Sequence, residues 1–357
     1  MQRREFIRQT AAGAAVLSVP AMATTPASVP KTTKMGIVVH SYWSRWQSKT
    51  ESGTYPSLHN ALELLDHCHK LGGGGIQTIV DDTWTSDFAR QVRDKASTLG
   101  LYFEGSVAMP KSPQNTTDFT RRINIAKEAG ASVVRTVCSN GRRYESYHSD
   151  EAFGAFKKNA VALMQAVEPI LKKQGVRLAI ENHKDWRADE LAPVMKQLAS
   201  EWVGVTIDFG NNFALLDDPM NLVQSLAPYV VSTHVKDMAM DEYADGFRLS
   251  EVPMGEGVLD LPAMVALCKK YNPAVTFSLE MITRDPLLIP CLTADYWQTF
   301  PTLPATNLAE TLRTVRQHPH PKGLPTVSQL TPEQRLAVED QNIRQCLTYS
   351  REKLGMV

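Results

Sequence analysis

The sequence predicts an α/β protein, a (β/α)8 TIM barrel with an additional C-terminal helix. Short, β-branched apolar runs alternate eight times with longer amphipathic segments between residues 34 and 318. Nearly continuous hydrophobicity in these runs is typical of parallel strands buried on both faces. None of the runs is followed by the GxGxxG turn of a doubly wound dinucleotide-binding sheet, which is the competing fold.

Composition limits the classes of function. The 357 residues include 38 Lys and Arg, 38 Asp and Glu, and 43% hydrophobic residues. This apolar content and charge balance exclude disorder over most of the chain. They also disfavour a nucleic-acid-binding protein, because such proteins carry clusters of basic residues. The five cysteines are widely spaced and form no CxxC pair, so they predict neither a zinc framework nor a disulfide scaffold.

Residues 1–23 predict an export signal. Arg3 and Arg4 precede a short apolar stretch, and small residues at Ala21 and Ala23 suit a signal peptidase. The segment resembles a bacterial twin-arginine signal, which implies a periplasmic location and the twin-arginine export machinery as a partner. The apolar stretch is shorter than the roughly 20 residues of a membrane span, so we expect no stable membrane insertion. Three Arg and one Glu lie in this segment, so its removal leaves 35 basic and 37 acidic residues.

A Pro/Thr/Ser-rich linker (24–33) precedes the predicted barrel (34–318). The expected strands are 35–40, 76–80, 102–107, 132–137, 177–181, 204–208, 230–234 and 276–280. The expected helices are 58–71, 86–99, 118–129, 151–173, 188–199, 219–227, 261–271 and 308–317. We expect the segments 237–256 and 282–304 to be irregular loops that determine specificity.

The C-terminal extension (319–357) contains one more predicted helix. Thr331 and Gln334 have the spacing of a capping box, and Pro332 occupies the first helical position. One apolar stripe follows, made of Leu336, Ile343, Leu347 and Leu354. The stripe predicts packing either on the barrel or on a partner subunit, which leaves a homo-oligomer open.

Four polar residues stand at the C-terminal ends of consecutive predicted strands, namely Glu181, Asp208, His234 and Glu280. Their separations are 27, 26 and 46 residues, and the first two match one strand–helix repeat each. Because the C-terminal ends of barrel strands converge on one mouth, we expect these side chains to share a space.

An acidic residue that closes a buried strand is costly unless it is paired or bound to a cation. Three carboxylates and one imidazole form a hard, oxygen-rich ligand set. This set predicts one bound divalent metal ion. Mn²⁺ is the preferred candidate, and Mg²⁺ and Co²⁺ are the alternatives. Taken singly, each carboxylate is equally well explained as a cap for the following helix.

Several motifs resemble those of the xylose-isomerase-like TIM-barrel superfamily of sugar isomerases and epimerases. They are Ile180-Glu181-Asn182-His183, Asp208-Phe209-Gly210-Asn211, His234-Val235-Lys236-Asp237, Gly255-Glu256-Gly257 and Glu280. The resemblance covers residues 34–318 and implies a metal held by Glu181, Asp208, His234 and Glu280. It also implies that Glu181 and Glu280 act as an acid/base pair on opposite faces of the substrate.

The sequence also departs from the ketose 3-epimerases of that superfamily. Asn211 stands where many relatives have a substrate-binding His, and Met240 stands where the epimerases have an Arg. These two differences count against classic ketose epimerisation. The metal-ligand set and the acid/base pair predict a metal-dependent isomerase or epimerase that acts on an unphosphorylated carbohydrate through an enediolate. The alternative is a lyase, dehydratase or hydrolase of an oxidised sugar or glycoside. A non-catalytic sugar-binding barrel and an abasic-site endonuclease are less favoured.

Further residues near the predicted strand ends are candidates for substrate binding. His183 and Lys236 follow two metal-ligand candidates and are placed to hold a substrate oxygen. Aromatic side chains after strands can stack on sugar rings. The complete set of candidates is His183, Lys236, His40, Glu104, Arg135, Asn211, Trp43 and Trp84.

Overall fold

The structure is a computed structural model that describes residues 34–46 and 48–356. The expected signal peptide (1–23) and linker (24–33) lie outside the described residues. No helix in this part of the chain combines the length and hydrophobicity needed to cross a membrane. All five cysteines are free thiols, and four of them are buried.

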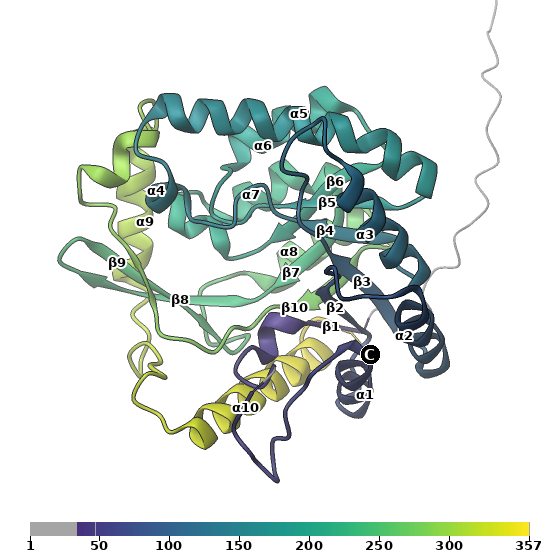
Figure 1. The fold of residues 1–357 in the computed structure, drawn as a ribbon. Coiled ribbons are helices and arrows are strands. Elements are labelled where there is room, and N and C mark those ends of the chain that lie inside the picture. Colours follow the sequence, from purple (N-terminus) through teal and green to yellow (C-terminus); the bar gives the residue numbers. More distant parts are fainter. Residues whose placement is uncertain (1–33, 47, 357) are drawn as a thin grey trace, which may run out of the picture. The chain divides into compact units, whose positions relative to one another are not determined.

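Eight parallel strands form a closed barrel, as the sequence predicts (Figure 1). Around the barrel the order is β1-β10-β7-β6-β5-β4-β3-β2, and pairing of β1 with both β10 and β2 closes it. The barrel strands are β1 (Gly36–Val38), β2 (Gly75–Ile79), β3 (Tyr102–Ser106), β4 (Val133–Thr136), β5 (Arg177–Glu181), β6 (Val203–Asp208), β7 (Val230–Val235) and β10 (Thr276–Leu279).

Helices surround these strands. The α-helices up to β10 are α1 (Ala61–Lys70), α2 (Ser86–Leu99), α3 (Thr117–Glu128), α4 (Arg143–Ser146), α5 (Asp150–Gln174), α6 (Ala188–Leu198), α7 (Pro219–Leu226) and α8 (Leu261–Tyr271). Short 3₁₀ helices are η1 (Val39–Tyr42), η2 (Asn211–Leu215), η3 (Ala227–Tyr229) and η4 (Asp295–Thr299). Local signals fix the ends: Thr85 caps the first turn of α2, and Gly100 ends it in the left-handed conformation.

The expected loop at 237–256 is instead mostly a β-hairpin. Strands β8 (Asp237–Tyr243) and β9 (Gly246–Val252) pair antiparallel, and β11 (Leu287–Ile289) joins them in a three-stranded sheet. The expectation of irregular structure was wrong because alternate residues, among them Met238, Met240, Phe247 and Leu249, build a second hydrophobic core. Asp245-Gly246, next to the turn, is the sequence signal that indicates such a hairpin.

The last two helices pack on different hydrophobic cores, and only the C-terminal one packs where the sequence predicts. Helix α9 (Ala305–Gln317), predicted as the eighth barrel helix, contributes Leu312 and Val315 to the second core beside the small sheet. Helix α10 (Pro332–Glu352) contributes Ile343 and Leu347 to the main barrel core and lies near β1 and α1 (Figure 1). The C-terminal extension therefore belongs to the same compact unit as the barrel.

Candidate metal centre

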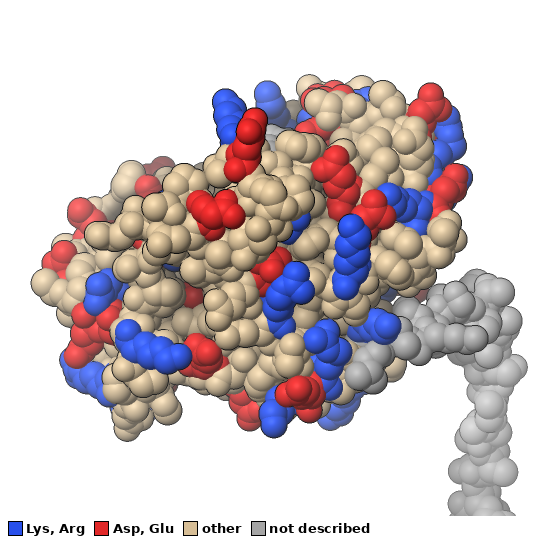
Figure 2. All heavy atoms as spheres, turned by 90° about the horizontal axis from the view of Figure 1, so that it is seen from below, with Lys and Arg blue, Asp and Glu red and all other residues tan. Residues whose placement is uncertain are grey.

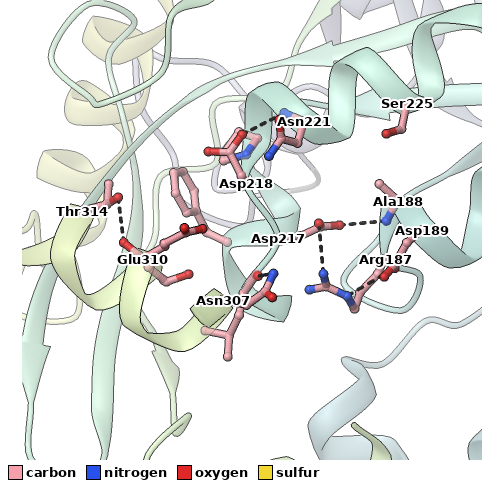
Figure 3. Close-up of a pocket in the computed structure, with 14 residues that line it drawn as sticks. Arg187, Ala188, Asp189, Asp217, Asp218, Asn221, Ser225, Asn307, Glu310 and Thr314 are labelled. Carbon is pink, nitrogen blue, oxygen red and sulfur yellow. Dashed lines mark hydrogen bonds and ion pairs between the residues drawn. The ribbon is translucent and has the colours of Figure 1, made fainter. Parts of the chain in front are cut away.

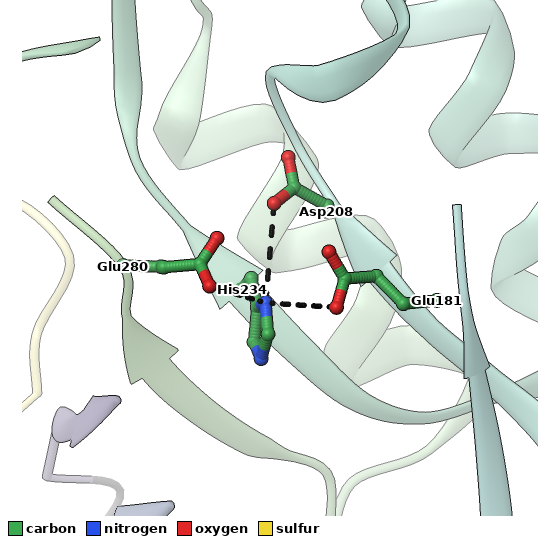
Figure 4. A group of neighbouring side chains, drawn as sticks. All are labelled: Glu181, Asp208, His234 and Glu280. Atoms are coloured by element: carbon green, nitrogen blue, oxygen red, sulfur yellow. Dashed lines mark ion pairs between the residues drawn. The ribbon is translucent and has the colours of Figure 1, made fainter. Parts of the chain in front are cut away.

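The four strand-end residues meet at one point (Figure 4). One ligand atom from each of Glu181, Asp208, His234 and Glu280 lies within 4.8 Å of all the others, and all four side chains are buried. Glu181, Asp208 and His234 belong to β5, β6 and β7, and Glu280 directly follows β10. Glu181 and Glu280 approach from opposite sides, with Asp208 and His234 between them.

The imidazole nitrogen of His234 that faces the three carboxylates has no hydrogen-bond partner among the described residues. His234 Nδ1 lies 3.4 Å from Glu181 Oε2, 3.4 Å from Glu280 Oε1 and 3.9 Å from Asp208 Oδ2, and it makes no hydrogen bond. Ligands held about 2.1 Å from one cation lie about 3 Å apart when adjacent, so the observed spacing fits a shared ion. The donor set and its geometry are therefore suited to a divalent cation.

The ring of His234 is oriented from the far side of the barrel. Its Nε2 lies 2.8 Å from Gln77 Oε1, and Gln77 Nε2 donates to Glu104 Oε2 at 2.9 Å. Because an amide oxygen only accepts, Nε2 carries a proton, so Nδ1 is the ring nitrogen that a cation would bind in place of a proton. Sequence reasoning missed Gln77, and no local signal indicates a partner that lies across the barrel.

Glu104 was expected to bind substrate, but its carboxylate is occupied inside the barrel. Ser232 and Thr276 donate to it in addition to Gln77. The Glu104 side chain is buried and does not reach a substrate. It instead holds Gln77, which orients the ring of His234.

Two further candidates for substrate binding, Arg135 and Asn211, form hydrogen bonds with the carboxylates of the cluster instead. Arg135 Nε donates to Glu181 Oε2, and its Nη1 donates to Ser106 Oγ at 3.1 Å. Asn211 Nδ2 donates to Glu181 Oε1 at 3.2 Å, and its backbone N–H donates to Asp208 Oδ1 at 2.8 Å. Asn211 is buried and has no free polar atom for a substrate.

Glu280 is held by two of the expected residues. Lys236 Nζ lies 2.7 Å from both Glu280 Oε2 and Asp208 Oδ2, and His40 Nδ1 lies 3.3 Å from Glu280 Oε1. Lys236 is completely enclosed, whereas His40 is partly exposed. His40 therefore stands between the buried cluster and solvent.

The electrostatics of the cluster are set by its burial. Although burial favours the neutral acids, Arg135 and His234 hold the pKa of Glu181 well below its usual value, and Lys236 and His234 do the same for Glu280. Burial opposes protonation of His234, but Glu280 and Glu181 raise its pKa to about 10. Burial, with the neighbouring carboxylates, raises the pKa of Asp208 despite Lys236. The three acids thus require nearby positive charge.

His183 lies just beyond Glu181 and keeps one ring nitrogen available. Its Nδ1 lies 3.3 Å from Ser139 O, so that nitrogen carries the proton and Nε2 remains an acceptor. Burial, aided by the charges of Lys184 and Arg135, lowers the pKa of His183 to about 4. The ring is therefore neutral at pH 7.

Both expected tryptophans line a cleft of about 700 Å³ beside the barrel mouth. Trp43 is 52% exposed, and its ring centroid lies 5.2 Å from that of His40. Trp84 is mostly buried against Phe88 and Phe103, so little of its ring is exposed. Trp43 is the better placed of the two to meet a ligand.

Two of the sequence motifs, the one that ends at Asp237 and Gly255-Glu256-Gly257, contact each other and stabilise a loop. Asp237 accepts hydrogen bonds from the backbone N–H groups of Gly255 at 2.9 Å and Gly257 at 3.1 Å. A Cβ on Gly257 would lie 2.1 Å from Asp237 Oδ1, which explains why this position is glycine. These contacts fix the connection from β9 to α8.

A separate pocket of about 240 Å³ lies on the outside of the barrel between α6, α7 and α9 (Figure 3). Its central polar groups bond to one another: Asp217 Oδ2 accepts from the backbone N–H of Ala188 at 2.8 Å, and Arg187 lies beside Asp217. It contains none of the expected site residues. On the face drawn in Figure 2, basic and acidic side chains of the described residues are interspersed rather than gathered into a basic area.

The closed barrel and the cluster at its mouth define the class of protein. The chain belongs to the xylose isomerase-like TIM barrel family, whose model matches residues 65–317.

Individual relatives are distant. The chain is 26% identical over 237 residues to 3-oxo-isoapionate decarboxylase of Pectobacterium atrosepticum, covering 64% of this chain and 79% of that one. It is 27% identical over 175 residues to a putative L-ribulose-5-phosphate 3-epimerase of Escherichia coli, covering 47% and 59%. A crystal structure of D-psicose 3-epimerase with D-fructose shares the fold, with a TM-score of 0.59 and 15% identity over 90% of this chain and 99% of that one.

Proposed function

We propose that this protein is a divalent-metal-dependent sugar isomerase or epimerase that acts on an unphosphorylated carbohydrate. The observation that carries the proposal is the placement of Glu181 and Glu280 on opposite sides of a buried cluster in which His234 Nδ1 has no hydrogen-bond partner within the part of the chain that the structure describes. A divalent ion held by Glu181, Asp208, His234 and Glu280, Mn²⁺ first, would polarise a substrate carbonyl and acidify the neighbouring C–H.

In the proposed reaction, Glu181 and Glu280 transfer protons, and the residues around them hold these two carboxylates in place. One of the two glutamates removes the proton and, now protonated, can return it to the neighbouring carbon, whereas delivery to the opposite face requires the other glutamate to pass on a proton taken up from solvent. Arg135 keeps Glu181 ionised and oriented, and Lys236 and His40 do so for Glu280. His183 Nε2 is available to accept a hydrogen bond from a substrate hydroxyl, and Trp43 offers an exposed ring near the same mouth.

A lyase reaction on an oxidised sugar is the second candidate. Position 240, which holds an Arg in the ketose epimerases, is a Met buried in the second hydrophobic core, where it cannot contact a substrate at the cluster. Asn211 is fully engaged with Glu181 and Asp208. The similarity of the sequence to a decarboxylase also supports a lyase reaction. Loss of CO₂ or of a β-hydroxyl proceeds through the same type of enediolate as isomerisation.

Export through the twin-arginine pathway to the periplasm is part of the proposal. Sugar phosphates are scarce outside the cytoplasm, which is one reason for proposing an unphosphorylated substrate. Fractionation of cells that produce the full chain, compared with an Arg3→Lys/Arg4→Lys double variant, tests this part.

The central experiment combines metal analysis with solvent exchange. We expect about one Mn, Mg or Co per chain, lost in Asp208→Ala, and incorporation of deuterium from D₂O into a sugar that the metal-loaded protein converts. Release of CO₂ or of a dehydrated product would select the lyase. Metal binding without exchange or product, across a panel of sugars, would mean a binding protein rather than an enzyme.

A further inference from the structure

Lys184 differs from every other buried cation among the described residues. Five of the six buried Lys and Arg side chains have a carboxylate within 4.0 Å, namely Arg45, Arg135, Arg143, Arg187 and Lys236. Lys184 is only 5% exposed and forms no ion pair within the described part of the chain. A buried ammonium without a counter-ion is costly, so its retention calls for an explanation.

The polar contacts of Lys184 leave donors unused. Its Nζ donates to Asn211 Oδ1, a neutral acceptor, and no other acceptor contacts it. An ammonium group has three donors, so two remain available. Its backbone φ is +66°, a left-handed conformation that costs free energy in a residue with a side chain. The backbone holds this position through a hydrogen bond of 2.9 Å from Arg143 N to Lys184 O.

The carboxylates around Lys184 are already matched with other cations. Asp208 and Glu280 share Lys236, Glu181 pairs with Arg135, and Glu251 accepts from both Nε and Nη2 of Arg284. Burial and, after it, the charges of Lys236 and Arg284 lower the pKa of Lys184 to about 8, which agrees with an ammonium group that has no counter-ion of its own.

We propose that Lys184 binds an oxyanion carried by the substrate, so that the substrate of the proposed reaction, on which this inference rests, is a sugar acid rather than a neutral sugar. The proposed unphosphorylated substrate makes the oxyanion a carboxylate; a phosphate has the same chemistry as a ligand for an ammonium. The anionic end lies beside Lys184 and Asn211, while the reacting carbons lie between Glu181 and Glu280. Arg284, whose side chain is 31% exposed, marks the solvent side of this region.

Calorimetric titration of the metal-loaded protein tests the inference with three probes: D-gluconate, D-glucose and D-glucose 6-phosphate. Lys184→Met removes the charge and keeps most of the side-chain volume, and Lys172→Met, at an exposed position without an ion pair, is the matched control. We expect gluconate to bind at least about tenfold more tightly than glucose in the wild type and in Lys172→Met, with the difference lost in Lys184→Met. We also expect Lys184→Met to unfold at a higher temperature than the wild type without ligand, because an unpaired buried charge has been removed.

Tighter binding of glucose 6-phosphate that also depends on Lys184 would support the oxyanion site with phosphate as its source. Equal binding of the three probes, no binding of any, or selectivity that survives in Lys184→Met would overturn it. The titration needs no turnover, so its result is separate from the proposed function. Gluconate binding through Lys184, together with no deuterium exchange into any keto sugar or keto sugar acid tested, would support the anion site and contradict the isomerase.

Discussion

Gln77 and His234 meet across the interior of the barrel, with Gln77 Oε1 2.8 Å from His234 Nε2. Their strands, β2 and β7, are separated by β1 and β10 in the barrel order. The contact assigns the ring proton to Nε2 and leaves Nδ1 as the atom that faces the three carboxylates.

Replacement of Gln77 therefore tests the metal centre without touching a proposed ligand. We expect Gln77→Leu to weaken Mn²⁺ binding by about 10- to 100-fold, because the His234 ring loses its orientation and its fixed tautomer. Calorimetric titration with Mn²⁺ measures the affinity, and Gln341→Leu, at an exposed position of α10, is the control. An unchanged affinity would show that Gln77 does not set the tautomer.

The second prediction concerns the acid/base pair. Glu280→Gln, assayed at saturating Mn²⁺, is expected to slow solvent deuterium exchange into the substrate by about 10²- to 10⁴-fold, since the amide cannot accept the proton. Glu352→Gln, at an exposed position, keeps the wild-type rate. Mass spectrometry of the recovered sugar measures the exchange. A loss smaller than tenfold would exclude Glu280 from proton transfer.

The third prediction follows from the position of α10. Ile343 is completely buried in the barrel core, so Ile343→Ala should lower the free energy of unfolding by about 2–5 kcal/mol. Because α10 completes that core, we expect one cooperative urea transition, shifted as a whole, by both tryptophan fluorescence and circular dichroism. Arg351→Ala, at an exposed position of the same helix, is the control. If the urea midpoint of barrel unfolding is the same in Ile343→Ala as in the wild type, α10 does not contribute to the stability of the barrel core.

The fourth prediction concerns pH. Glu339 Oε1 and Oε2 accept the backbone N–H groups of Ser44 at 2.7 Å and Arg45 at 3.1 Å, and burial raises the pKa of Glu339 from 4.5 to about 7. The folded state keeps this proton between pH 4.5 and 7 while the unfolded state loses it. The contribution to stability is therefore full below about pH 4.5 and is lost as the pH rises through 7, by about 3 kcal/mol at most.

The comparison of wild type with Glu339→Gln isolates this titration from those of other buried acids. The variant cannot ionise, so we expect the wild type to lose stability relative to it between pH 5 and 8, measured by urea unfolding at each pH. A difference that stays constant across that range would contradict the raised pKa of Glu339.

The sequence predicted the barrel well because buried parallel strands leave a strong local signal, continuous β-branched hydrophobicity. It also brought Glu181, Asp208, His234 and Glu280 together, since strand ends in a barrel converge by topology alone. The partners of these residues were not predictable in the same way. Gln77 reaches His234 from a strand 157 residues away, and nothing in its neighbours indicates that contact.

The errors have physical reasons as well. The polar segment after β7 hides an alternation of apolar residues, for example Phe247 and Leu249, that is masked by the charged residues between them. The position of α9 could not be predicted from periodicity, because an amphipathic helix can cover either the barrel or the second hydrophobic core. Lys184 was overlooked because a lysine after a strand normally reaches solvent, and only the packing around it encloses its ammonium group.

The place of α10 in the barrel core has a consequence for biosynthesis. During translation, β1 is made before the other barrel strands, yet α10 and the buried Met356 beyond it, which cover the same core, are made after all of them. The barrel therefore cannot reach its final packing until residues 332–356 have left the ribosome. An affinity tag fused directly after this segment would begin at a buried residue, so a spacer is needed to let the last turn close against the barrel.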